Sequence, residues 1–63
     1  MNVTLSRFRE HLENGLRFEL EERAWWEQQI ADGRVSWAHA EGYIRAANAN
    51  IPLKSRLLRF LGA

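Results

Sequence analysis

The chain has 63 residues, a formal net charge of +1 and 46% hydrophobic residues. A chain of this length forms one small domain, here residues 1–63, and buries only about 60% of its unfolded surface, so its core is marginal. Its lack of cysteine excludes disulfides, cysteine-based zinc sites and thiol chemistry, and no apolar run reaches the roughly 18 residues that a membrane-spanning helix needs.

The first predicted element is a long helix over residues 4–31. Apolar side chains recur along one face at helical spacing: Leu5, Phe8, Leu12, Leu16, Trp26 and Ile30. Opposite charges four residues apart predict five ion pairs that each add about 0.2–0.5 kcal/mol: Arg9/Glu13, Glu13/Arg17, Arg17/Glu21, Glu19/Arg23 and Arg23/Glu27. Gly33 is expected to end this helix, because glycine is common just after a helix C-terminus.

Gly15 leaves an alternative open within this helix. Asn-Gly is a turn signal, and a glycine inside a helix costs about 1 kcal/mol relative to alanine. Leu12, Leu16 and Leu20 nevertheless stay in phase across Gly15. We therefore favour one long helix, with or without a bend at Gly15.

Two shorter helices are predicted to follow, over about residues 36–48 and 53–61. Ser36 is a good cap for the first of them, and its apolar stripe comprises Trp37, Ala40, Ile44 and Ala47. The segment 48–52 breaks this pattern, and Pro52 suits the first turn of a new helix. The sequence thus predicts an all-α fold with one long N-terminal helix plus two shorter helices, in a helical hairpin or three-helix arrangement.

The length of the first helix bears on the oligomeric state. A helix over residues 4–31 is about 42 Å long, whereas a compact chain of 63 residues is only about 27 Å across. Two short helices cover part of such an apolar stripe. Either a second chain covers the remainder or Gly15 folds the helix back, and we expect a homodimer.

The adjacent tryptophans have different expected roles, because a helix turns about 100° per residue and points them in different directions. Trp26 belongs to the main apolar stripe and is the expected core tryptophan. Trp25, Phe18 and His11 form a second, sparse stripe. Three interpretations of it remain open: cover by the third helix, a homodimer contact, or a site for a different protein. With Tyr43, these residues are the predicted protein interface, since tryptophan and tyrosine often anchor interfaces.

Enzyme signatures are missing from the sequence. It contains no glycine-rich phosphate loop, nucleophile elbow or HExxH motif. Four glutamates of the first helix are interpreted as a solvated face rather than as acid/base groups: Glu10, Glu13, Glu21 and Glu22. His11 and His39 are interpreted as surface or interface histidines, with a metal shared across a dimer as the alternative. We therefore expect no enzymatic activity, no catalytic residues and no cofactor.

Charge is distributed unevenly along the chain. Residues 1–32 carry four arginines and seven acidic residues, a formal charge of −3, whereas residues 33–63 carry five basic residues against Glu41 alone, a charge of +4. Opposite halves attract each other within one chain or between chains. The basic half also raises the alternative of nucleic-acid binding.

The segment YIRAANANIPLKSRLLRFLGA, residues 43–63, resembles a helix-turn-helix. The small residue Ala46 precedes a turn near Asn50, and a short basic helix follows. The resemblance implies DNA contact through Lys54, Arg56 and Arg59. The segment departs from that family in having asparagine instead of glycine at the turn, and an arginine at position 56 where an apolar residue is usually buried.

In size, helical content and lack of cysteine, the whole chain resembles the small early-region accessory proteins of temperate, lambda-like bacteriophages. That resemblance implies a non-enzymatic early regulatory protein that binds a host or phage protein. The first 14 residues lack the basic and apolar segments of a signal peptide. We therefore expect a cytoplasmic protein, in the host cytoplasm if it is phage-encoded, without a membrane partner.

Overall fold

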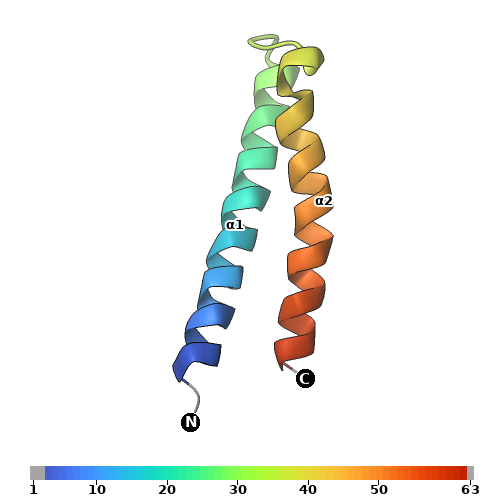
Figure 1. Cartoon of the computed structure of the whole chain (residues 1–63). Helices are drawn as coiled ribbons and strands as arrows, with labels where there is room; N and C mark the ends of the chain where they lie inside the picture. The colour runs from blue at the N-terminus through green and yellow to red at the C-terminus, as the bar shows by residue number, and fades with distance from the viewer. Residues whose placement is uncertain (1–2, 63) are drawn as a thin grey trace.

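The computed structural model describes residues 3–62, with only the backbone at Val3. Over these residues the chain forms two α-helices, α1 (Val3–Ala31) and α2 (Trp37–Gly62), joined by a turn over residues 32–36. Figure 1 shows them side by side and antiparallel. The hairpin measures 49 × 15 × 14 Å with a radius of gyration of 14.5 Å, against about 11 Å for a compact chain of this length.

The turn between the helices is fixed by signals that the sequence displays. The Gly33 N–H donates to the Ile30 carbonyl at 3.0 Å, and Gly33 has a φ of 73°, which favours glycine. The Arg34 N–H donates to the Gln29 carbonyl at 2.9 Å. These two bonds form a Schellman motif. Across the turn, the Ser36 hydroxyl accepts a backbone N–H three residues later, at 3.2 Å, so both predicted caps are confirmed.

The second half of the chain forms one helix, so the predicted arrangement of a long helix plus two shorter helices is wrong. α2 runs without interruption from Trp37 to Gly62 through the segment 48–52, where we expected a break, and Pro52 lies inside it. A proline in a helix interior costs about 3 kcal/mol, because it removes one hydrogen bond and crowds the preceding turn. Contacts with α1 must offset this cost.

The apolar contact between α2 and α1 continues across the proline. Ala40, Ile44 and Ala47 are buried against α1, and Ile51 follows four residues later as a half-buried side chain. Pro52 itself is exposed on the flank of the helix. The stripe therefore keeps its phase through the expected break, and ending the helix there would remove the later half of the stripe from α1.

Polar contacts from α1 also hold the segment around the proline. Arg23 donates to Asn48 Oδ1 at 2.9 Å, and Asn50 Nδ2 donates to Glu19 Oε1 at 2.8 Å. Lys54 Nζ lies 3.0 Å from Glu19 Oε2. Glu19 thus binds one residue on each side of the proline, separated by one helical turn, which favours helical backbone between them.

The five ion pairs predicted within α1 do not form between the described residues. Several of their members make contacts across the hairpin instead: Arg9, for example, donates to the Leu61 carbonyl at 2.7 Å. Within the described range the ion pairs are Lys54 with Glu19 and, inside α2, Arg45 with Glu41. The charges of α1 therefore position α2 more than they stabilise α1 itself.

α1 is the long helix that the sequence predicts over residues 4–31, and it continues through Gly15. The alternative in which Gly15 folds the helix back is wrong. A Cβ atom at Gly15 would lie 3.0 Å from Lys54 Nζ. Glycine at this position therefore leaves room for the Lys54 side chain to lie across α1 and reach Glu19.

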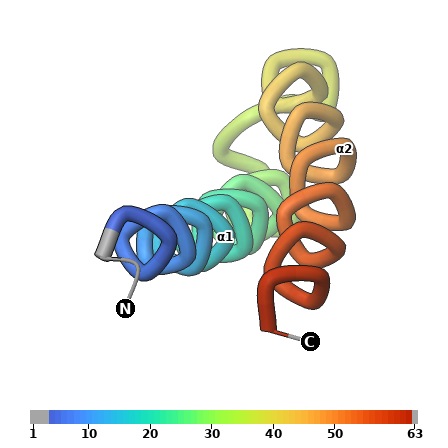
Figure 2. Tube along the Cα trace, turned by 60° about the horizontal axis from the view of Figure 1, so that its bottom comes forward, coloured from blue at the N-terminus to red at the C-terminus, as the bar shows by residue number. Residues whose placement is uncertain are grey.

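The two helices bury little of their apolar surface. The buried hydrophobic residues of the described range are Leu12, Ala40, Ile44 and Ala47. Trp26, the expected core tryptophan, is only half-buried. Figures 1 and 2 both show the helices diverging away from the turn, and side chains of the main stripe such as Phe8 are 48% exposed there. The hairpin is a pair of helices with unpartnered faces.

Candidate protein-interaction surface

An aromatic cluster lies between the helices near the turn. The Trp26 ring stacks on Tyr43, with centroids 4.6 Å apart and an interplanar angle of 12°. The Trp25 ring meets Trp26 edge-on at 4.9 Å and 83°, a geometry that aromatic quadrupoles favour. His39 lies 5.8 Å from Trp26. Trp26 therefore contacts two aromatic side chains that are both more exposed than its own: Trp25 from α1 and Tyr43 from α2.

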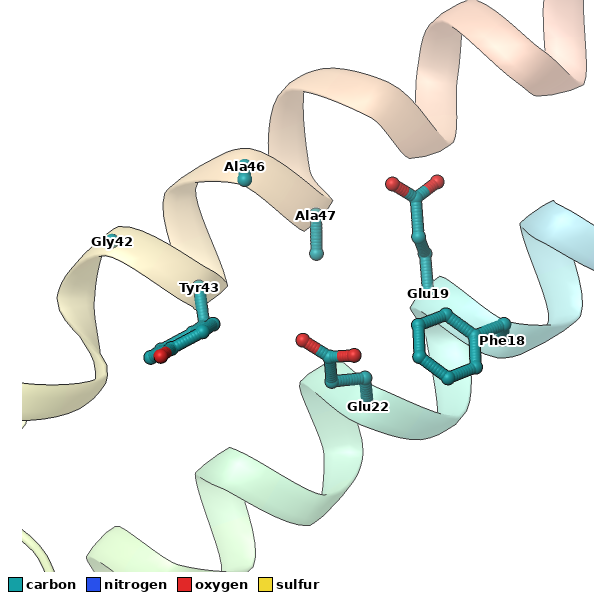
Figure 3. Close-up of a pocket in the computed structure, with 7 residues that line it drawn as sticks. All are labelled: Phe18, Glu19, Glu22, Gly42, Tyr43, Ala46 and Ala47. Carbon is teal, nitrogen blue, oxygen red and sulfur yellow. The ribbon is translucent and has the colours of Figure 1, made fainter.

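A groove of about 310 Å³ adjoins this cluster (Figure 3). Its walls come from both helices: Phe18, Glu19, Glu22, Gly42, Tyr43, Ala46 and Ala47. Gly42, Ala46 and Ala47 of α2 are small and leave this space open. The rings of Phe18 from α1 and Tyr43 from α2 border it. The Glu22 carboxylate makes no hydrogen bond or ion pair within the described residues. The groove thus offers apolar surface with one available anionic group.

Glu19 also lines the groove and is a residue that the sequence-based prediction missed. Its side chain is only 16% exposed, and its Oε2 atom faces Lys54 Nζ without an aligned hydrogen bond. The signal is a seven-residue spacing, because Leu5, Leu12, Glu19 and Trp26 occupy equivalent positions on α1. A glutamate at a core-facing position predicts a partner on the opposing helix.

Three of the four predicted interface residues are more than half exposed and cluster together. Phe18 is 62% exposed, Trp25 is 53% exposed and Tyr43 is 52% exposed. Phe18 and Tyr43 share the groove, and Trp25 and Tyr43 both contact Trp26. The interpretation that a third helix covers Phe18 and Trp25 is wrong. His11 is exposed, does not line the groove and makes no ring contact within the described range.

The helix-turn-helix geometry is absent from residues 37–62. No turn occurs at Asn50, because α2 is continuous there. Lys54, one of the three predicted DNA-binding residues, pairs with Glu19. Arg56 and Arg59 are exposed and form no ion pair within the described residues. They are available cations on a straight helix rather than parts of a recognition motif.

Residues 3–62 contain no cluster of three or more His, Cys, Asp or Glu side chains placed to hold a metal ion. Neither helix, over the residues described, combines the length and hydropathy needed to span a bilayer.

No protein-family model matches the chain, and comparisons with curated proteins and with solved structures gave no match either. The chemistry of the exposed surface is therefore what indicates a function.

Proposed function

We propose that this protein is a non-enzymatic accessory protein that acts by binding another protein through the groove and its aromatic rim. The observation that carries the proposal is that Phe18 and Tyr43 line one groove, that Trp25 meets the Trp26 ring on which Tyr43 stacks, and that all three stay more than half exposed. Phe18 and Trp25 are seven residues apart on α1 and therefore lie on the same flank of that helix. The three side chains form one surface.

The chemistry of the groove fits an apolar side chain from a protein partner. Exposed aromatic side chains are common hot spots of interfaces, and clustered exposed apolar surface marks interaction sites. Phe18 and Tyr43 offer apolar ring surface to such a side chain. The Glu22 carboxylate at the groove favours a partner that brings a lysine or arginine beside the apolar group, because this pairing would fix its orientation.

The biological setting remains a prediction. The resemblance to early-region accessory proteins of lambda-like bacteriophages supports a regulatory role in which a host or phage protein in the cytoplasm is the partner. Self-association, the other expected mode of protein binding, also remains a prediction.

Matched alanine variants test the aromatic surface. Wild-type protein, Phe18→Ala/Trp25→Ala and the control Leu20→Ala are immobilised in turn, and proteins retained from a bacterial lysate are quantified by mass spectrometry. Leu20 is 42% exposed and lies about 200° around α1 from Phe18. We expect a partner retained by the wild type and the control but lost from the double variant. Equal retention by all three proteins would contradict the proposal.

DNA binding is the second candidate, and it is favoured by Arg56 and Arg59, which form no ion pair within residues 3–62. Titration with random duplex DNA at low and moderate salt tests it, because binding through phosphate contacts weakens steeply as salt rises. We expect no complex even at low salt. A salt-sensitive complex that Arg56→Gln/Arg59→Gln abolishes would favour the DNA candidate.

A further inference from the structure

The outer face of α2 is an apolar stripe that no part of the described chain covers. Its residues recur every three or four positions and are all exposed: Gly42, Ala46, Ala49, Leu53, Leu57 and Phe60. Most lie two residues from a position that packs on α1, about 200° around the helix. Leu53 is 53% exposed and Phe60 is 80% exposed. We call these six residues the outer stripe.

The outer stripe changes in size along its length. Its first half is small (Gly42, Ala46 and Ala49) and its second half is bulky (Leu53, Leu57 and Phe60). Two copies of such a stripe in antiparallel orientation, with a two-fold axis near Ile51, set every bulky residue against a small one. Phe60 then faces glycine, and both leucines face alanines. Parallel copies would set bulk against bulk and leave voids between the small residues, which close packing disfavours.

The chain exposes more surface than a compact monomer of its mass. This excess is close to the area that one such contact would bury. The chain exposes 4946 Å², whereas a compact monomer of 7.4 kDa exposes about 4,200 Å². The excess of roughly 700 Å² approaches the ~800 Å² that each partner contributes to a typical stable interface. A second copy on the outer stripe would bring the chain close to the exposed area of an ordinary globular protein.

We infer that a second copy of this chain docks antiparallel on the outer stripe of α2, forming an isologous dimer in which α2 packs against α2. This goes beyond the proposed partner site, because it uses the outer side of α2. The two surfaces meet at Gly42 and Ala46, which also line the groove. Phe60 of the second copy packs over Gly42 at the edge of the groove.

The charges of α2 give this dimer little salt dependence. Arg56 and Arg59 lack ion-pair partners within the described residues, but antiparallel docking separates Arg56 from its copy by about 15 Å along the helix axis, and Arg59 from its copy by more. These separations exceed the Debye length of about 10 Å at 0.1 M salt. The dimer should therefore change little as NaCl rises from about 0.1 M to about 1 M. A dimer that paired the acidic α1 with the basic α2 would weaken over the same range.

Disulfide cross-linking tests the register, because the chain has no cysteine of its own. Ala46→Cys and Leu57→Cys are oxidised separately and as a mixture. Antiparallel docking places residue 46 against residue 57 of the second copy, whereas like residues lie about 16 Å apart along the helix axis, beyond disulfide reach. We expect cross-linking in the mixture, and little in either variant alone or in a control mixture of Leu20→Cys with Leu57→Cys. Cross-linking of each single variant alone, or none in the mixture, would overturn the inference.

Sedimentation of Ala49→Arg separates this interface from the aromatic surface. Ala49 is exposed in the single hairpin, and arginine is a good helix former, so the variant keeps its helical content. Two unpaired charges near the two-fold axis should weaken the dimer by at least ~100-fold. Trp25→Ala should leave the dimer intact while reducing partner retention. The opposite result would be loss of the dimer in Trp25→Ala and an intact dimer in Ala49→Arg. It would place self-association on the aromatic surface and refute the proposed dimer interface on the outer stripe.

Discussion

Replacing Gly15 by alanine tests how the helices are locked together. In an ordinary helix interior, replacing glycine by alanine raises the free energy of unfolding by about 1 kcal/mol. Here the new Cβ atom would lie 3.0 Å from Lys54 Nζ, and the three nearest atoms all belong to the Lys54 side chain. Lysine must therefore move away from Glu19, with which it forms a pair whose side chains are 30% and 16% exposed. Weakening such a pair costs up to about 1 kcal/mol, so we expect a net stabilisation of only 0 to about 0.5 kcal/mol.

A double-mutant cycle isolates this coupling. Gly15→Ala is introduced into the wild type and into Lys54→Ala, and urea unfolding is followed by circular dichroism for all four proteins. In the Lys54→Ala background the substitution should raise the free energy of unfolding by the full ~1 kcal/mol. The coupling free energy should be about 0.5–1 kcal/mol. Equal effects in both backgrounds would show that Lys54 does not lie across Gly15.

Three further substitutions test the fold. The Leu12 side chain is only 6% exposed, so Leu12→Ala should lower the free energy of unfolding by about 2–5 kcal/mol. Circular dichroism at 25 °C should then show most of the chain unfolded. A decrease of less than about 1 kcal/mol would refute the place of Leu12 in the core. Pro52→Ala should raise stability by up to about 3 kcal/mol in urea unfolding, because it restores a helix-interior hydrogen bond; no gain would indicate that the helix restarts at Pro52. Gly33→Ala should cost about 1 kcal/mol by calorimetry, because φ is 73° there, and a stabilised variant would exclude that conformation.

The elements that could be predicted from sequence are those whose signals are local. α1 follows from its apolar period, and its end follows from Gly33, which the Schellman bonds satisfy. The cap at Ser36 is a contact between residues three positions apart. Such features depend on neighbouring residues in the chain, and little in the rest of the fold can override them.

The continuity of α2 does not follow from the sequence, because local signals for a break compete with tertiary contacts that favour one helix. Pro52 and the asparagines before it favour a break. The apolar stripe that runs from Ala47 to Ile51 keeps its phase, however, and Glu19 binds both sides of the proline. Two asparagines that looked like turn residues serve as hydrogen-bond partners for α1. Placing them correctly required knowing that Glu19 faces α2.

The sequence places Phe18 and Trp25 on a second stripe of the first helix and Tyr43 at the edge of another, but it predicts no groove. All three side chains are exposed, and their role as an interface stays a prediction. Their convergence depends on which face of α2 meets α1. The same orientation of α2 makes the outer stripe, with Phe60 at its end, face away from the hairpin. In the predicted arrangement of three helices, part of this stripe would have been buried.

The central claim is that one hairpin leaves apolar surface that a second copy of the chain covers. Sedimentation equilibrium of the wild-type protein, measured from low to high micromolar concentration, tests it most directly. The account predicts a molar mass that rises with concentration to twice the 7.4 kDa of the chain. A mass that stays at 7.4 kDa throughout this range, at both low and high salt, would contradict it.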